Sequence, residues 1–127
     1  MPAALAHAAT WRNASIVRKG SWIGATSTSA YKSTVSGSTQ AGARLTLTFT
    51  GRGVAVVGST GPNRGKANIY IDGVAISSIS TRSRTNHSRR VLFMRYLPAG
   101  GTHTITFEST GAWATPLVRL DAFVVLK

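Results

Sequence analysis

Cysteine is absent from this 127-residue sequence. Its absence excludes disulfide bonds, thiolate metal sites and cysteine nucleophiles. The histidines His7, His87 and His103 are too scattered to match a recognised zinc spacing, so we predict no metal site and no cofactor. No stretch approaches the roughly eighteen consecutive apolar residues that a membrane-spanning helix needs. The length fits one domain with a single core.

Acidic residues are scarce. Asp72, Glu108 and Asp121 stand against 15 lysines and arginines, which gives a formal net charge of +12. Reactions that need two cooperating carboxylates must draw on these three residues, and no Ser-His-Asp set can be nominated from their positions. We therefore predict no catalytic residues, and an enzyme is the least favoured class. A charge of this size on a small body attracts polyanions such as nucleic acid, teichoic acid or acidic glycan.

Helical periodicity is also missing, whereas apolar and polar residues alternate repeatedly from residue 44 to the end. The pattern predicts strands over these ranges: 15–19, 44–50, 54–58, 67–72, 74–80, 89–97, 102–108 and 117–126. Strands in this number suit a two-sheet sandwich better than an open sheet with one unprotected apolar face. We predict an all-β fold, an antiparallel two-sheet jelly-roll-like β-sandwich of about eight strands, with the domain at 15–127 and an N-terminal arm at 1–14.

The phase of the alternating runs predicts which side chains form the core. These positions are expected to point into one core: Leu45, Leu47, Phe49, Ile69, Ile71, Ile105, Phe107, Leu120 and Val124. A slip of the apolar phase between Ile76 and Ile79, across Ser77-Ser78, predicts a β-bulge. Asp72-Gly73 predicts a two-residue hairpin turn, because both turn positions favour positive φ.

The antiparallel succession of strands predicts where a binding site lies. The short turns would all fall at one end of the sandwich: 51–53, 72–73 and 98–101. The longer connections would meet at the other end: 59–66, 82–88 and 110–116. Binding residues concentrate on loops held by a rigid scaffold, so the end with the long loops is the predicted site.

Candidate ligand-binding residues lie on these loops and in the Ser/Thr-rich segment 26–42. Trp113 could stack on the apolar face of a sugar or a base, and its alternative role is to cap the core. The loop arginines could hold phosphate, sulfate or carboxylate groups through bidentate contacts, and their alternative role is a solvated edge. The predicted ligand-binding residues are Trp113, Arg64, Asn63, Arg82, Arg84, His87 and Tyr31.

From Ala43 to the C-terminus the order of motifs resembles a domain common in secreted proteins of actinobacteria. The motifs are TFTG at 48–51, GPNRGKANIYIDG at 61–73, GTHTITF at 101–107 and VRLDAFVVL at 118–126. Such domains are similar to galactose-binding-like or jelly-roll carbohydrate-binding modules, which are often appended to hydrolases or adhesins. The resemblance implies a β-sandwich that attaches a larger protein to a glycan or a cell surface, and it implies no catalytic residues.

The expected function is that of a non-catalytic module for carbohydrate or an anionic glycopolymer, secreted or on the cell surface as part of a longer protein. The alternative is a structural subunit of an assembly, such as a phage virion or decoration protein, which would have protein partners. Nucleic acid is expected to bind only through non-specific charge, because no helix-turn-helix, RNP-type or zinc motif is present. The size in solution and the salt dependence of binding discriminate among these classes.

Overall fold

A computed structural model describes residues 6–10, 16–26, 34–98, 101–111 and 117–126, and these ranges contain strands and no helix. The strands are β1 (Ala6–Thr10), β2 (Ile16–Lys19), β3 (Ile23–Thr26), β4 (Thr34–Ser38), β5 (Arg44–Thr50), β6 (Gly53–Thr60), β7 (Lys66–Ile71), β8 (Val74–Ser80), β9 (His87–Tyr96), β10 (Thr102–Ser109) and β11 (Val118–Leu126). These ranges hold no helix that is long and apolar enough to cross a membrane.

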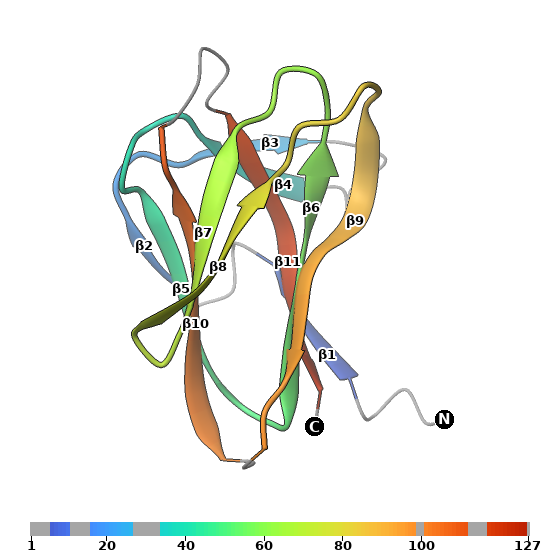
Figure 1. The fold of residues 1–127 in the computed structure, drawn as a ribbon. Helices are drawn as coiled ribbons and strands as arrows, with labels where there is room; N and C mark the ends of the chain where they lie inside the picture. Colours follow the sequence, from blue (N-terminus) through green and yellow to red (C-terminus); the bar gives the residue numbers. More distant parts are fainter. Residues whose placement is uncertain (1–5, 11–15, 27–33, 99–100, 112–116, 127) are drawn as a thin grey trace.

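The strands form two antiparallel sheets packed face to face (Figure 1). The five-stranded sheet has the order β2-β5-β10-β7-β8, and the six-stranded sheet has the order β3-β4-β11-β6-β9, with β1 also paired to β11. The predicted all-β two-sheet sandwich is confirmed. The strands that the alternation did not indicate are β1, β3 and β4, and β1 lies within the segment expected to be an arm.

The core fills the space between the sheets. It contains the predicted side chains of Leu45, Leu47, Phe49, Ile69, Ile71, Ile105, Phe107 and Leu120. The six-stranded sheet adds Val54, Val56 and Phe123, all fully buried. Trp22 packs against this core, with its ring centroid 6.2 Å from that of Phe107.

The prediction for Val124 is wrong. The register between β11 and β6 shifts between Leu120 and Ala122, so Asp121 is an extra residue in β11. A bulge of this kind moves every later side chain to the other face of the strand. Phe123 and Val125 therefore enter the core, whereas Val124 is half-buried and lies outside it.

The bulge predicted in β8 is present, one residue from its expected position. Ile69 pairs with Ser77 and Tyr70 pairs with Ala75, so the register skips Ile76. The hairpin turn before β8 has the predicted conformation, because φ is 51° at Asp72 and 80° at Gly73.

The two ends of the sandwich differ as the strand parity predicts. At one end the short turns meet, and Gly51 N donates a hydrogen bond to Gly101 O at 3.0 Å. At the opposite end lie the longer connections β6–β7, β8–β9 and β10–β11, at the top of Figure 1. We call the described part of these connections, residues 61–65, 81–86, 110–111 and 117, the loop end.

Candidate functional site

Backbone hydrogen bonds fix the loop end to a single arrangement. Gly61 N donates to Thr81 O at 3.1 Å, and Thr81 N donates to Gly65 O at 2.9 Å. Gly65 N then donates to Leu117 O at 2.7 Å, which joins the third connection to the other two. The fully buried Thr81 hydroxyl adds a bond of 2.7 Å to Gly65 O. Segments distant in sequence therefore form one preorganised platform, as the parity argument predicts.

Arg64 is the central cation of this platform. Arg64 is buried. Its Nε donates a hydrogen bond to Ser59 Oγ at 3.1 Å, and its Nη1 donates one to Asn63 Oδ1 at 2.5 Å. Burial lowers the pKa of the Arg64 guanidinium, and the positive charge of Arg119 lowers it further. A buried guanidinium that is held in this way, and that is repelled by a second positive charge, favours an anion beside it.

Arg82 and Arg84 are exposed on the β8–β9 connection. Together with Pro62 and Ser83 they line a shallow depression of about 460 Å³. The bridge between Gly61 and Arg82 places the two connections side by side at this point. The predicted arginines therefore share one open surface, which a flat or extended ligand could contact.

His87 lies at the start of β9 beside a second depression, of about 390 Å³, which also includes Ser83. Arg90 Nη2 lies 2.8 Å from His87 Nδ1, and Thr85 Oγ1 lies 2.9 Å from His87 Nε2. Since arginine can only donate, Nδ1 accepts, and the hydrogen-bond pattern assigns the Nε2–H tautomer to a neutral imidazole that donates to Thr85. His87 is thereby held in a fixed orientation at the border of the arginine surface.

The structure thus brings Asn63 and Arg64 into direct contact and places Arg82 and Arg84 on the adjacent depression. His87 lies next to them through the shared Ser83. The predicted stacking residues Trp113 and Tyr31 lie outside the described residues. The ligand-binding roles of all seven residues stay predictions.

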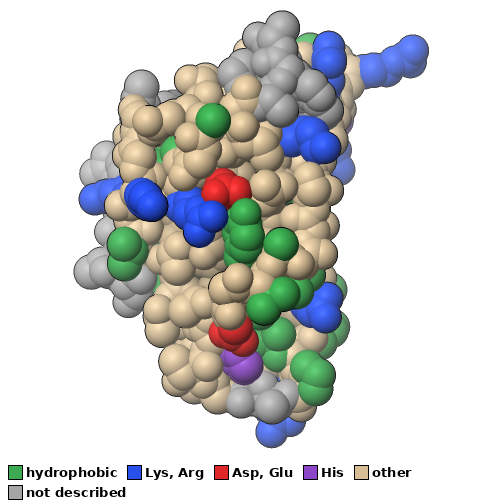
Figure 2. Space-filling model, turned by 60° about the vertical axis from the view of Figure 1, so that its left-hand side comes forward, with side chains coloured by type: hydrophobic (Ala, Val, Ile, Leu, Met, Phe, Trp, Pro, Cys, Tyr) green, Lys and Arg blue, Asp and Glu red, His purple; other side chains and the backbone are tan. Residues whose placement is uncertain are grey.

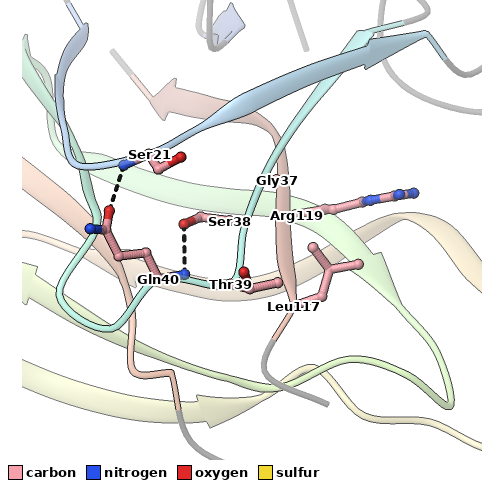
Figure 3. Close-up of a pocket in the computed structure, with 7 residues that line it drawn as sticks. All are labelled: Ser21, Gly37, Ser38, Thr39, Gln40, Leu117 and Arg119. Carbon is pink, nitrogen blue, oxygen red and sulfur yellow. Dashed lines mark hydrogen bonds between the residues drawn. The ribbon is translucent and has the colours of Figure 1, made fainter.

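Sequence reasoning did not indicate a further pocket between β4 and β11, of about 240 Å³ (Figure 3). It is lined by Ser21, Gly37, Ser38, Thr39, Gln40, Leu117 and Arg119. Ser21 N donates to Gln40 Oε1 at 2.6 Å, and Gln40 N donates to Ser38 Oγ at 3.1 Å. The pocket offers hydroxyl and amide groups beside the apolar Leu117, a combination that suits a hydroxyl-rich ligand, whereas the guanidinium of Arg119 points away from these groups (Figure 3).

This pocket has only a weak signal in the sequence. The segment that contributes Ser38, Thr39 and Gln40 is conspicuous for its serines and threonines, but nothing in it indicates that β4 pairs with β11. Gly37 pairs with Arg119, and a Cβ at Gly37 would lie 3.3 Å from both Arg119 Cγ and Leu117 Cδ1. Leu117 connects the pocket to the loop end, because it lines the pocket and its carbonyl oxygen accepts the hydrogen bond from Gly65 N.

The acidic residues outside the core form polar contacts, and those of Glu108 lie on the outer face of the five-stranded sheet. Glu108 accepts hydrogen bonds from Arg44 Nε at 2.7 Å, Tyr70 Oη at 2.9 Å and Asn68 Nδ2 at 3.1 Å. Figure 2 shows this face, on which each visible acidic group lies beside a basic or histidine side chain. Burial tends to raise the pKa of Glu108, but the hydrogen bonds and the charge of Arg44 outweigh it, and the pKa lies below its ordinary value.

Asp72 makes the other such contact, near the hairpin turn. Its Oδ2 lies 2.7 Å from His103 Nδ1, and its Oδ1 accepts a bond of 2.9 Å from Thr104 N. The hydrogen bond with His103, followed by that from Thr104, lowers the pKa of Asp72. Asp121 is fully buried in β11. In the described ranges no three His, Asp or Glu residues lie close enough together to hold a metal ion.

Comparison with solved structures finds the same fold in proteins that bind or act on carbohydrate. A family 35 carbohydrate-binding module from Clostridium thermocellum matches with a TM-score of 0.65 at 12% identity, over 94% of this chain and 98% of the module. The chain has the fold of a carbohydrate-binding module. The resemblance inferred from the sequence motifs is confirmed at the level of the fold.

Two esterases contain the same fold. A two-domain esterase active on acetylated mannans matches with a TM-score of 0.70 at 14% identity, over 96% of this chain and 36% of the esterase. A family two carbohydrate esterase from Cellvibrio japonicus matches with a TM-score of 0.67 at 18% identity, over 95% of this chain and 33% of that protein. At these identities the likeness concerns the fold alone.

One curated relative matches by sequence, an A type blood N-acetyl-alpha-D-galactosamine deacetylase from Flavonifractor plautii. The two are 30% identical over 112 residues, which is 88% of this chain and 14% of the deacetylase. The chain therefore spans about a seventh of the length of this relative. No family model matches the sequence.

Proposed function

We propose that this chain is a non-catalytic binding module that attaches to carbohydrate or to an anionic cell-surface polymer through its loop end. In this proposal the module belongs to a longer secreted or cell-surface protein. The extent of the structural matches supports a module: the likeness covers 98% of a carbohydrate-binding module but 33% and 36% of the two esterases. The fold therefore corresponds to a whole binding module and to one part of those enzymes.

The observation that carries the proposal is the cationic platform of the loop end. The positive charge of Arg119 acts on the buried Arg64, and the exposed Arg82 and Arg84 lie on the adjoining connection. Rigid placement reduces the entropy that a ligand-binding surface loses on binding, so preorganised guanidinium groups bind anions well. The pocket beside Arg119 adds hydroxyl and amide groups that suit the neutral part of a sugar.

A binding screen at two salt concentrations tests the proposal, with neutral glycans, uronic or sulfated glycans and teichoic acid as probes. Affinity for the anionic probes should fall as salt rises, whereas binding through stacking and hydrogen bonds to neutral sugars should persist. The double variant Arg82→Gln/Arg84→Gln should lower the affinity for the anionic probes by several-fold to about ten-fold. The charge-matched control is Arg52→Gln/Arg95→Gln at the opposite end of the sandwich, which should bind as the wild type does.

Trp113 provides the separate test for neutral glycans. If the ring of Trp113 stacks on the sugar, Trp113→Ala should weaken the binding of a neutral glycan by about 1–3 kcal/mol. The proposal fails if no glycan or surface polymer binds, or if the control pair at the opposite end loses as much affinity as the loop-end pair.

A further inference from the structure

β9 carries three large apolar side chains that are exposed. Val91, Met94 and Tyr96 expose 63%, 54% and 68% of their surface. The register places them opposite Val57, Ala55 and Gly53 of β6. Since Val54 and Val56 point into the core, these three positions of β6 face outward. Val91, Met94 and Tyr96 therefore lie together on the outer face of the six-stranded sheet.

The apolar surface continues from β9 across β6 to β11. A Cβ at Gly53 would lie 3.1 Å from Leu126 Cδ1 and 3.3 Å from Tyr96 Cδ1, so these two side chains border the glycine from both sides. Val124 pairs with Ala55 in the same row as Met94. This arrangement explains why Val124 is outside the core yet half-buried. We call the surface formed by Val91, Met94, Tyr96, Val124 and Leu126 the β9 face.

The other side of β9 carries two arginines, with Phe93 between them packed against the core. Arg90 pairs with Gly58 and Arg95 pairs with Val54, so both arginines lie opposite to the side that carries Met94 and Tyr96. Both are exposed at the edge of the sandwich. Tyrosine, methionine and arginine are the residue types enriched in protein interfaces. Along this strand, the exposed apolar side chains and the two exposed arginines thus lie on opposite sides.

β9 is also an edge strand, the last in the order of its sheet (Figure 1). Among the described strands it pairs with β6 alone, and from Phe93 to Tyr96 the register is regular. An edge strand offers backbone groups to an incoming strand, and soluble proteins usually keep large apolar side chains away from such an edge. The arginines are consistent with edge protection, but Val91, Met94 and Tyr96 are not.

We propose that the edge of β9 accepts an extended segment of an acidic partner protein as an additional strand. Alternate residues of that segment would lie on the two faces of the sheet. Its apolar side chains would pack beside Val91, Met94 and Tyr96, and its carboxylates would meet Arg90 and Arg95. A second copy of this chain is a poor occupant, because each copy carries a net charge of +12 and β9 against β9 would place arginines beside arginines.

Fluorescence anisotropy with labelled, capped peptides as long as β9 tests this proposal on the full chain. The probe alternates valine and glutamate, and the matched probe alternates valine and lysine. The wild type should bind the glutamate probe at least about ten-fold more tightly than it binds the lysine probe. Arg90→Glu/Arg95→Glu should reverse this preference. Tyr96→Ser, which keeps every charge, should weaken the binding of both probes and leave the preference for the glutamate probe in place.

Two further measurements separate strand addition from other causes. Arg18→Glu/Lys19→Glu makes the same change in net charge on β2, at the far edge of the other sheet, and it should keep the preference for the glutamate probe. An equal loss in this control, or equal binding of both probes by the wild type, overturns the proposal. Sedimentation equilibrium that shows a dimer disrupted by Tyr96→Ser would overturn it as well, because a second copy would then occupy the face.

Discussion

The loop end should lose stability when the hydroxyl of Thr81 is replaced. Thr81→Val keeps the shape of the side chain and removes its bond of 2.7 Å to Gly65 O. A neutral hydrogen bond contributes about 0.5–1.5 kcal/mol net to folding, and a buried acceptor left without any donor would cost more. Gly65 O keeps the bond from Thr81 N at 2.9 Å, so it retains a donor. We therefore expect a loss of about 1 kcal/mol in the free energy of unfolding.

Urea unfolding measures this change, with the slope m checked for constancy so that the midpoint reports stability alone. The matched control is Thr48→Val on the exposed side of β5, where the change should stay within about 0.5 kcal/mol. Thr81→Val should also weaken the binding of anionic glycan, because the platform that positions Arg64 loses one of the hydrogen bonds that hold it in place. Wild-type stability in Thr81→Val, or an equal loss in the Thr48 variant, would refute the reasoning.

Three other outcomes follow from the packing and the charges. Phe107 is fully buried, so Phe107→Ala should lower the free energy of unfolding by about 3–5 kcal/mol in denaturant titrations; a loss below about 1 kcal/mol would contradict this. The hydrogen bond to Glu108 is the main cause that raises the pKa of Tyr70, so Glu108→Gln should shift the ultraviolet titration of Tyr70 back toward its ordinary pKa; an unchanged midpoint would count against it. The hydrogen bond with His103 is the main cause that lowers the pKa of Asp72, so its stabilising effect is present above the ordinary carboxyl pKa and is lost as pH falls through the lowered value. Asp72→Asn should therefore flatten the acid side of the stability profile, and equal slopes in both proteins would disprove it.

The fold was predictable from residue 44 onward because apolar and polar residues alternate in several strands there. Alternation in β5, β7 and β10 directly records which residues enter the core. In contrast, β1, β3 and β4 have the sequences AHAAT, IGAT and TVSGS, which show no alternation of large apolar residues. These short strands form where β11 provides a pairing partner, directly for β1 and β4 and through β4 for β3. Tertiary context outweighs local propensity in such strands.

The candidate site was predictable in position and only partly in composition. Strand parity placed the three long connections at one end, and the backbone bonds among Gly61, Thr81 and Leu117 agree with it. The burial of Arg64 had no signal, because a loop arginine between glycines reads as an exposed residue. The apolar phase of β11 also predicted the wrong side for Val124, since one extra residue at Asp121 moves the later side chains to the opposite face. Bulges and pairings between distant segments are not encoded in local alternation.

The electrostatics of the loop end lead to a last prediction, which concerns Arg119. Burying the Arg64 guanidinium removes a charge from water, and the nearby Arg119 adds repulsion; both effects lower the pKa of Arg64 and oppose folding. Such an unfavourable arrangement at a preorganised surface is typical of binding sites, where a ligand of opposite charge relieves it. Arg119→Gln should therefore keep or raise the melting temperature of the free protein, because it removes the repulsion.

The same substitution should weaken anion binding, because one of the two neighbouring guanidinium groups is lost. Thermal melts with and without dextran sulfate measure both effects, since a ligand that binds the folded state raises the melting temperature. The wild type should gain more from the polyanion than Arg119→Gln does, and Arg52→Gln, which removes the same charge at the opposite end, should gain as much as the wild type. A free Arg119→Gln protein that melts earlier than the wild type and gains equally from dextran sulfate would show that Arg119 supports the fold and not an anion site.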